Sequence, residues 1–371
     1  MKPKIVGLID CYNSPDFGPM TLHRNVSSTT FLGRYEFIDF PLSNFINSGI
    51  ENIGILIENH IRSMTRHVTN GRGWMMNTKV GSFNILYDEQ HVRVPSYNTD
   101  VSNLVENEWF LKQVNPDYVV IAPTAMVNVV DYRKVIADHI ASGSRITMLY
   151  THQKGCHKAF IGAKKIFLDA RRKVKSIEKN QGDSDEADIA MGILVMDYPM
   201  LQSLVSYAEG TSCFFSIMDT LAYLSPSVLI QAVPYTGYVR YFDSLSHYLQ
   251  YSLDILNEDV AKQILLPEWP IYTKTYDTQP AYYGTASDVR KSLIANGSRI
   301  EGTVINSILG RDVIVKKGSV IKNCVIGSHA VFDRDTHIEN AVIDKEAQVL
   351  HISEVIGTLD DPVYIGKGDI V

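Results

Sequence analysis

The feature that most constrains the fold of this chain is a repeat in its C-terminal third. Segments that start at Leu309, Ile326 and Ile343 lie 17 residues apart. In each, a small or aliphatic residue follows four positions after the first residue, and an apolar residue follows six positions after it. Such spacing is typical of a β-helix of hexapeptide repeats, in which three short faces make one coil. A row of β-hairpins would instead need strict two-residue alternation and a turn pair at each reversal. We therefore predict a β-helix over residues 287–371.

A different pattern fills the first two-thirds of the chain, where short apolar runs alternate with segments of helical periodicity. The sequence predicts buried strands at 4–9, 52–57, 118–122 and 145–151, and helices at 39–48 and 132–142. Alternating strands and helices favour an α/β domain of Rossmann-like type, with a mixed, mostly parallel sheet covered on both faces. We predict this domain over residues 1–255 and a linker over 256–286, where three prolines favour extended chain. Ligands of such sheets bind beyond the carboxyl ends of the strands.

Composition narrows the functional classes. The chain has 371 residues and a net charge of −6, and its basic residues are scattered, so nucleic acid and anionic membranes are disfavoured as partners. Its four cysteines are far apart and form no metal-binding spacing, which favours free thiols in a reducing cytoplasm. The N-terminal apolar run is too short for a signal peptide, and the chain has no apolar stretch of about 18 residues that could span a membrane.

Two motifs carry a family resemblance. Residues 34–50 are RYEFIDFPLSNFINSGI, and residues 8–21 are LIDCYNSPDFGPMT. With these motifs the chain resembles the bacterial glucose-1-phosphate adenylyltransferases over nearly its whole length, and it is most similar to their D-type, non-catalytic subunit. The resemblance implies a nucleotidyltransferase-like domain followed by a left-handed β-helix, and assembly with a homologous catalytic subunit into a heterotetramer.

The resemblance also exposes losses in the loop that should cradle a nucleoside triphosphate. In the family, paired glycines after the first strand let backbone N–H groups approach the phosphates. Here Asp10 and Cys11 occupy those places, and Asp16 adds a second carboxylate that would repel a triphosphate. Further along, Val26 replaces the lysine of the following motif.

The magnesium ligands that the resemblance implies are missing as well. Ala125 occupies the position of the first metal-binding aspartate, and Tyr241 occupies the position of the second. Neither side chain is a hard oxygen ligand of the kind that Mg²⁺ requires. We therefore expect no metal on this chain and expect Mg²⁺ on the catalytic partner.

The sugar-phosphate segment is half preserved. Glu178, Lys179, Met191 and Gly192 match the family's motifs, whereas Asn180 replaces a proline. These residues predict at most a weak sugar-phosphate contact, and a solvated surface pair is the simpler interpretation of Glu178 and Lys179.

Basic residues form a candidate effector site. Arg62, Arg66 and His67 lie on one predicted helix, and with Arg24, which the resemblance places nearby, they could bind a phosphorylated effector. A solvated helix face is the favoured alternative for these residues.

The sequence thus predicts a catalytically inactive, regulatory subunit of a glucose-1-phosphate adenylyltransferase in glycogen biosynthesis. One alternative is an active nucleotidyltransferase whose metal ligands have moved to Asp10, Asp16 or Asp243. Another is a hexapeptide-repeat acyltransferase, for which His329 and His337 are candidate bases by residue type alone.

Overall fold

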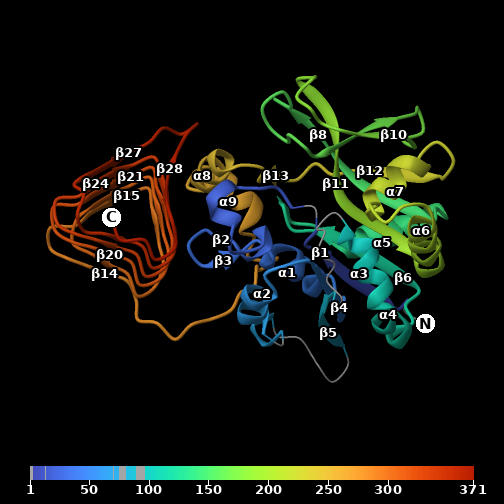
Figure 1. Cartoon of the computed structure of the whole chain (residues 1–371), viewed down its shortest axis with the longest axis horizontal. Helices are drawn as coiled ribbons and strands as arrows, with labels where there is room; N and C mark the ends of the chain where they lie inside the picture. Colours follow the sequence, from blue (N-terminus) through green and yellow to red (C-terminus); the bar gives the residue numbers. More distant parts are fainter. Residues whose placement is uncertain (1–2, 13, 70, 75–80, 89–96) are drawn as a thin grey trace. The chain divides into compact units, whose positions relative to one another are not determined.

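A computed structural model describes residues 3–12, 14–69, 71–74, 81–88 and 97–371 (Figure 1). The chain forms two compact units. The first unit comprises Met1–Ser14, Ile38–Tyr241 and Pro267–Tyr272, and the second comprises Pro15–Phe37, Phe242–Leu266 and Thr273–Val371. These units divide the chain differently from the boundaries at 255 and 287, because residues 15–37 and 242–266 group with the C-terminal segment.

The first unit is built on a nine-stranded mixed sheet with a parallel centre. Strands β6, β1, β4 and β5 are parallel neighbours, and β11 runs antiparallel to both β6 and β8. The strands are β1 (Ile5–Asp10), β4 (Asn52–Ile57), β5 (Ser82–Tyr87), β6 (Tyr118–Pro123), β8 (Ile146–Lys154), β9 (Lys164–Leu168), β10 (Val174–Lys179), β11 (Glu186–Asp197) and β12 (Ile230–Pro234). A two-stranded sheet pairs β7 (Met126–Val127) with β13 (Arg240–Tyr241). The predicted α/β class with a mixed sheet is confirmed.

Helices cover both faces of this sheet, so the unit has two hydrophobic cores. Helices α3, α4, α6 and α7 pack on one face around Leu8 and Ile121, and α1, α2 and α5 pack on the other around Ile9 and Val120. Neighbouring residues of one strand enter opposite cores because side chains alternate along a strand. The helices are α1 (Asp39–Asn47), α2 (Ile61–Val68), η3 (Arg72–Trp74), α3 (Asp100–Glu106), α4 (Glu108–Val114), α5 (Tyr132–Ser142), α6 (Tyr198–Thr211) and α7 (Ile217–Leu224). In the part of the chain that the structure describes, no helix combines the length and apolarity that crossing a bilayer requires.

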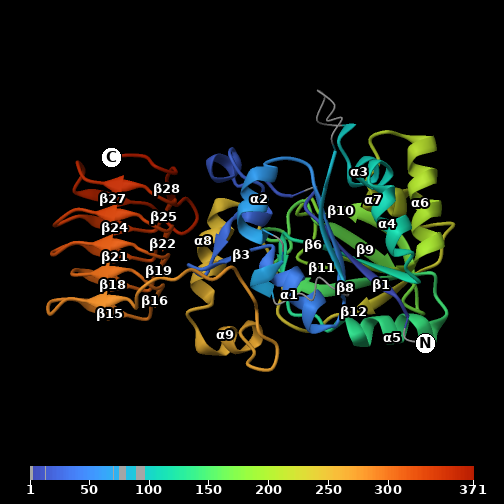
Figure 2. The same cartoon turned by 90° about the horizontal axis from the view of Figure 1, so that it is seen from below.

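The second unit contains the predicted β-helix, whose coils Figure 1 shows end on and Figure 2 from the side. Three parallel sheets of five strands form its faces, and the aliphatic residues of the repeat fill its interior. The strands are β14 (Tyr282–Tyr283), β15 (Asp288–Arg290), β16 (Leu293–Ile294), β17 (Arg299–Ile300), β18 (Thr303–Ile305), β19 (Ile308–Leu309), β20 (Ile314–Val315), β21 (Val320–Lys322), β22 (Val325–Ile326), β23 (Val331–Phe332), β24 (His337–Glu339), β25 (Ala341–Ile343), β26 (Gln348–Val349), β27 (Glu354–Ile356) and β28 (Val363–Ile365).

Two segments distant in sequence pack with the β-helix in the second unit. They carry η1 (Gly18–Thr21), η2 (Val26–Ser28), β2 (Thr30–Phe31), β3 (Tyr35–Glu36), α8 (Leu245–Asp254) and α9 (Glu258–Ile264). Helix α9 lies inside the predicted linker, so that linker is partly helical. Five aromatic rings join the two segments into a buried cluster, namely Phe17, Phe31, Phe37, Phe242 and Tyr248.

A buried ion pair ties the first of these segments to the β-helix. The Arg24 guanidinium binds both carboxylate oxygens of Asp344, and the Tyr364 hydroxyl donates to the same carboxylate at 2.9 Å. Arg24 is 9% exposed and Asp344 is 3% exposed. Fork-like pairing of arginine with a carboxylate fixes both distance and orientation.

An asparagine ladder runs along one corner of the β-helix. The Asn306 amide donates to Asn323 at 2.8 Å, Asn323 donates to Asn340 at 3.0 Å, and Asn340 donates to the Gly357 carbonyl at 3.0 Å. All three asparagines have positive φ, between 46° and 52°. Asparagine tolerates this conformation better than most residues with a side chain, so the repeat selects it at the corner.

We expect Asn323→Ala to lower the free energy of unfolding by about 2 kcal/mol, because it removes two hydrogen bonds and leaves alanine at positive φ. Asn306→Ala is the matched control, since Asn306 has the same backbone conformation but makes only one ladder bond, so its loss should be smaller by the contribution of one hydrogen bond, about 0.5–1 kcal/mol. Calorimetric unfolding of both variants measures the difference. Equal losses would show that the ladder bonds contribute nothing beyond the backbone conformation.

Candidate functional site

A cavity of about 340 Å³ opens beyond the carboxyl ends of β1 and β6 in the first unit. This is where the sequence places the site, because ligands of parallel sheets bind at that edge. The cavity brings together residues of the strand ends, of the irregular stretch of β11 between Ala190 and Leu194, and of the starts of α3 and α7. Its lining is Asp10, Tyr12, Ser14, Asp100, Ile121, Pro123, Thr124, Ala125, Met126, Gly162, Ala163, Lys164, Lys179, Ala190, Met191, Gly192, Leu194, Ser216, Ile217, Met218, Asp219 and Tyr241.

The two positions at which the resemblance implies metal ligands lie side by side. Ala125 directly precedes β7, and Tyr241 of β13 pairs with Met126 of β7. Ala125 is 7% exposed and offers only a methyl group, while the Tyr241 ring stacks on Phe160 at 6.1 Å between centroids. A methyl and a neutral phenol do not fit Mg²⁺, which binds carboxylates and water. Among the described residues, no group of three or more His, Cys, Asp or Glu side chains is arranged to hold a metal.

Two carboxyl groups, the half-buried one of Asp10 and the buried one of Asp100, lie in the cavity where the resemblance implies a phosphate cradle. Asp10 ends β1 and accepts a hydrogen bond from the Tyr12 backbone N–H at 2.9 Å. Burial raises the pKa of Asp10 to about 7. The pKa of Asp100 is also raised, first by burial and then by the charge of Asp10. The N–H groups of Val101 and Ile217 favour the ionised form of Asp100, but burial and the charge of Asp10 outweigh them, so ionisation of one carboxyl group disfavours ionisation of the other.

Hydrogen bonds fix the residues that follow β1, at the positions where the family has glycines. The Tyr12 hydroxyl donates to the Ile57 carbonyl at 3.3 Å and accepts from the Asn103 amide at 2.9 Å. Cys11 is 1% exposed, and its backbone N–H donates to the Leu56 carbonyl at 3.0 Å. Because the Cys11 N–H is bonded to Leu56 and the Tyr12 N–H to Asp10, neither backbone group is available to a phosphate.

An ion pair also lines the cavity. Lys164 of β9 donates to Asp219 at 2.7 Å, and Asp219 also accepts from the Ser216 hydroxyl at the start of α7. Burial opposes ionisation of Asp219, but the hydrogen bonds from Lys164 and Ser216 outweigh it and lower the pKa. The Asp219 carboxylate therefore helps to cap α7 and neutralises Lys164.

The sugar-phosphate residues separate into two groups. Lys179, Met191 and Gly192 line the cavity, whereas Glu178 does not, because it points to the other side of β10. Gly192 has φ of 70°, and a Cβ there would approach Pro123 to 2.8 Å, so glycine is required. Asn180, which replaces the family's proline, is fully buried and donates to the carbonyls of the 156–160 loop.

The effector candidates are not gathered on one helix face. His67 is 6% exposed, and its Nε2 lies 2.6 Å from an Asp39 oxygen, against the Trp74 ring. Arg62 and Arg66 are exposed on α2, as expected for a solvated face. Arg24 belongs to the second unit, where it is already bound to Asp344. An effector at Arg24 would therefore have to displace a buried ion pair.

The residues of the alternative hypotheses have other partners. Asp16 accepts hydrogen bonds from the Gly18 N–H and the Thr21 hydroxyl, and Asp243 is paired with His247. Both aspartates belong to the second unit, as does Val26, which is buried in η2.

The two acyltransferase candidates lie on the β-helix surface. The His329 side chain is 60% exposed, and its Nδ1 lies 3.7 Å from a carboxylate oxygen of Asp312; the His337 side chain is 42% exposed and lies between Glu339 and Glu354. Histidines this accessible, with carboxylates beyond hydrogen-bond length, lack the oriented environment of a catalytic base.

Sequence reasoning missed Asp100, Lys164 and Thr124. Asp100 follows Thr99, whose side chain caps α3, so the sequence did contain a signal for the start of a helix. That signal does not indicate that the Asp100 carboxyl group is buried. The Thr124 hydroxyl is buried in the cavity lining without a hydrogen-bond partner. A buried hydroxyl of this kind costs about 1–3 kcal/mol unless a ligand or water satisfies it.

Comparisons with known proteins agree with this architecture. Residues 17–225 match the family model described as nucleotidyl transferase, and residues 278–361 match the GlmU-like, C-terminal hexapeptide model. The chain is 27% identical over 350 residues to the glycogen biosynthesis protein GlgD of Bacillus subtilis, covering 94% of this chain and 91% of the relative. It is 27% identical over 346 residues to the glucose-1-phosphate adenylyltransferase of Clostridioides difficile, covering 90% and 89%. A GlgD protein of Geobacillus stearothermophilus is 29% identical over 328 residues, covering 86% and 84%.

Proposed function

This chain belongs to the nucleotidyl transferase family, and we propose that it acts there as a catalytically inactive, regulatory subunit. The enzyme it would regulate is a homologous glucose-1-phosphate adenylyltransferase of glycogen biosynthesis, which makes ADP-glucose from ATP and glucose 1-phosphate. Relatives called GlgD and glucose-1-phosphate adenylyltransferase, which the chain matches along most of its length, support this assignment.

One observation carries the proposal of inactivity. Ala125 and Tyr241 are neighbours in the cavity at the positions where the resemblance implies two metal-binding aspartates. Nucleotidyl transfer depends on a metal ion to neutralise the charge that develops on the phosphates. Asp10 adds to the obstacle, because an ionised carboxylate in the cavity lining would repel a triphosphate and a protonated one offers no positive charge.

The retained part of the cavity supports a narrower role for small molecules. Lys179, Met191 and Gly192 keep one wall of the sugar-phosphate site, so weak binding of a sugar-phosphate effector belongs to the proposal. Regulation would then act as a coupling free energy between this chain and the catalytic subunit, with Mg²⁺ bound on that subunit.

The first test is a turnover assay with the purified chain, ATP, glucose 1-phosphate and Mg²⁺. We expect no ADP-glucose above background. Turnover that survives repurification of the chain would contradict inactivity, and calorimetric titration with Mg²⁺ would then locate the ligands through Asp10, Asp16 and Asp243 variants.

The second test mixes the chain with a catalytic glucose-1-phosphate adenylyltransferase of the same organism. We expect a complex whose mass corresponds to a heterotetramer, and a changed maximal rate or apparent substrate affinity. The control is a catalytic subunit whose metal-binding aspartates are replaced. Its mixture with this chain should form no ADP-glucose. No effect at any mixing ratio would contradict the regulatory role while leaving the inactivity of this chain unaffected.

A further inference from the structure

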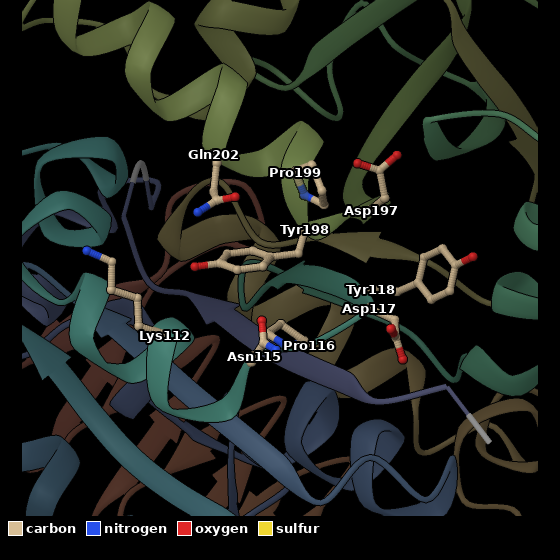
Figure 3. A pocket seen from close by; sticks show the side chains of 9 residues that line it. All are labelled: Lys112, Asn115, Pro116, Asp117, Tyr118, Asp197, Tyr198, Pro199 and Gln202. Carbon is tan, nitrogen blue, oxygen red and sulfur yellow. The ribbon is translucent and has the colours of Figure 1, made fainter. Parts of the chain in front are cut away.

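A separate pocket of about 570 Å³ lies on the first unit (Figure 3). Its residues come from α4, from the turn into β6 and from the junction of β11 with α6: Lys112, Asn115, Pro116, Asp117, Tyr118, Asp197, Tyr198, Pro199 and Gln202. Here β6 begins and the antiparallel β11 ends, whereas the candidate active cavity lies where β6 ends. The pocket is thus at the opposite edge of the sheet, and none of its residues lines that cavity.

Tyr198 is the central residue of this pocket. It is 7% exposed, and its hydroxyl is buried without a hydrogen-bond partner. Figure 3 shows the hydroxyl turned toward the side chains of Lys112 and Gln202. Burial and the Glu108 charge raise the pKa of Tyr198, while nearby Lys112 and Gln202 act to lower it, and the net shift is upward. Gln202 is therefore close to the phenol, yet no hydrogen bond of ordinary geometry joins them.

The unsatisfied hydroxyl points to a ligand oxygen. A buried polar group without a partner is costly, and native proteins nearly always supply one. Lys112 and Gln202 are exposed, flexible side chains that can swing aside to admit a ligand. The neutral phenol can then both donate to a ligand oxygen and accept from a ligand hydroxyl.

The charges of the pocket argue against an anionic ligand. Lys112 is paired with Glu108 at 2.7 Å and Asp197 with Arg145 at 3.3 Å, and Asp117 adds a further carboxylate to the lining. A phosphate would meet a negative surface with no free compensating cation among the lining residues. The remaining polar groups, the amides of Asn115 and Gln202, both donate and accept hydrogen bonds.

The apolar groups of the pocket suit the C–H face of a ring. The Tyr198 ring, Pro116 and Pro199 provide apolar surface beside these amides and carboxylates. A ligand that combines an apolar C–H face with a rim of hydroxyls matches both parts. The volume falls within the roughly 300–1,000 Å³ typical of small-molecule sites.

We propose that this pocket binds a neutral pyranose sugar, whose hydroxyls bond to the Tyr198 hydroxyl and the Gln202 amide. The sugar is either a free molecule or the end of an oligosaccharide, since both present the same ring. This proposal does not depend on the regulatory role proposed above, because the pocket shares no residue with the candidate active cavity.

The test titrates the full-length chain with glucose, maltose, maltoheptaose and inorganic phosphate, followed by ligand-observed NMR. We expect saturable sugar binding and none for phosphate. Tyr198→Phe removes only the unpartnered hydroxyl, so it should leave thermal unfolding unharmed and weaken sugar binding about fivefold. Gln202→Ala, at an exposed position, should weaken binding by a similar factor.

The matched control is Tyr207→Phe, because Tyr207 lies on the same helix α6, is 37% exposed and is absent from the pocket lining. Sugar binding should be unchanged in this variant. Tighter binding of maltoheptaose than of glucose would assign the site to oligosaccharide ends, and equal binding would assign it to free sugars. The proposal is overturned if no sugar saturates the chain, if phosphate binds in preference, or if neither pocket variant weakens the binding.

Discussion

Replacing Arg24 with methionine is expected to lower the free energy of unfolding of the second unit by about 3 kcal/mol. The substitution removes one partner of a buried ion pair and leaves the Asp344 carboxylate, 3% exposed, without its counter-charge. The Tyr364 hydroxyl and the Lys345 N–H still donate to Asp344, so the loss should lie at the lower end of the usual range of about 3–5 kcal/mol.

Calorimetry and peptide-level hydrogen exchange measure this effect. The three tryptophans, at 74, 109 and 269, all belong to the first unit, so tryptophan fluorescence does not report on the second. Peptides from residues 15–37 should exchange faster in the variant. Arg34→Met is the matched control, because Arg34 lies in the same segment but is exposed. The double variant Arg24→Met/Asp344→Leu should recover much of the loss, and a single variant as stable as the wild type would refute the structural role of the pair.

Replacing Asp10 with asparagine is expected to stabilise the first unit at neutral pH. Desolvation raises the pKa of Asp10 in the folded chain from its ordinary value of 3.8 to about 7. Between these two pH values the folded state holds a proton that the unfolded chain has released, so the wild type loses stability as pH rises. Asparagine keeps the acceptor for the Tyr12 N–H and does not ionise. The difference in free energy of unfolding between Asp10→Asn and the wild type should therefore grow by about 2 kcal/mol between pH 5 and pH 8.

Tryptophan fluorescence suits this measurement, since all three tryptophans lie in the unit that changes. Asp219→Asn provides a control of opposite sign. The lowered pKa of Asp219 means that its ionised form stabilises the fold above its ordinary pKa, and this contribution is lost as pH falls. Asp219→Asn should thus destabilise the chain at neutral pH and cost least in acid. An Asp10→Asn effect that does not change with pH would contradict the raised pKa of Asp10.

Local patterns predicted the elements of this fold well. The strands at 4–9, 52–57, 118–122 and 145–151 correspond to β1, β4, β6 and β8, and the 17-residue spacing corresponds to coils of the β-helix. Both signals are periodic and local, so burial of one face specifies them without knowledge of the rest of the chain. The proximity of Ala125 and Tyr241 followed from the resemblance, and the β7–β13 pairing explains it physically.

Long-range polar pairs could not be predicted from the sequence. Arg24 and Asp344 are 320 residues apart, and nothing in either local pattern indicates that they meet. His67 was a candidate for binding an effector because of its neighbours on α2, whereas its actual partner Asp39 lies on another helix. The raised pKa of Asp10 likewise depends on its desolvation in a cavity lined by residues from several distant segments, which no single segment encodes. Charged residues reveal their type in a sequence, but tertiary packing decides whether each one is solvated, paired or neutral.

The division of the chain into its two units has a practical consequence for protein engineering. The backbone passes between the units five times, at residues 14–15, 37–38, 241–242, 266–267 and 272–273. A chimera that exchanged only residues 287–371 with those of a homologue would separate the new β-helix from the Phe17 and Tyr248 cluster and from Arg24, with which the native coils were selected to pack. A chimera should therefore replace all three segments of the second unit at once, namely residues 15–37, 242–266 and 273–371.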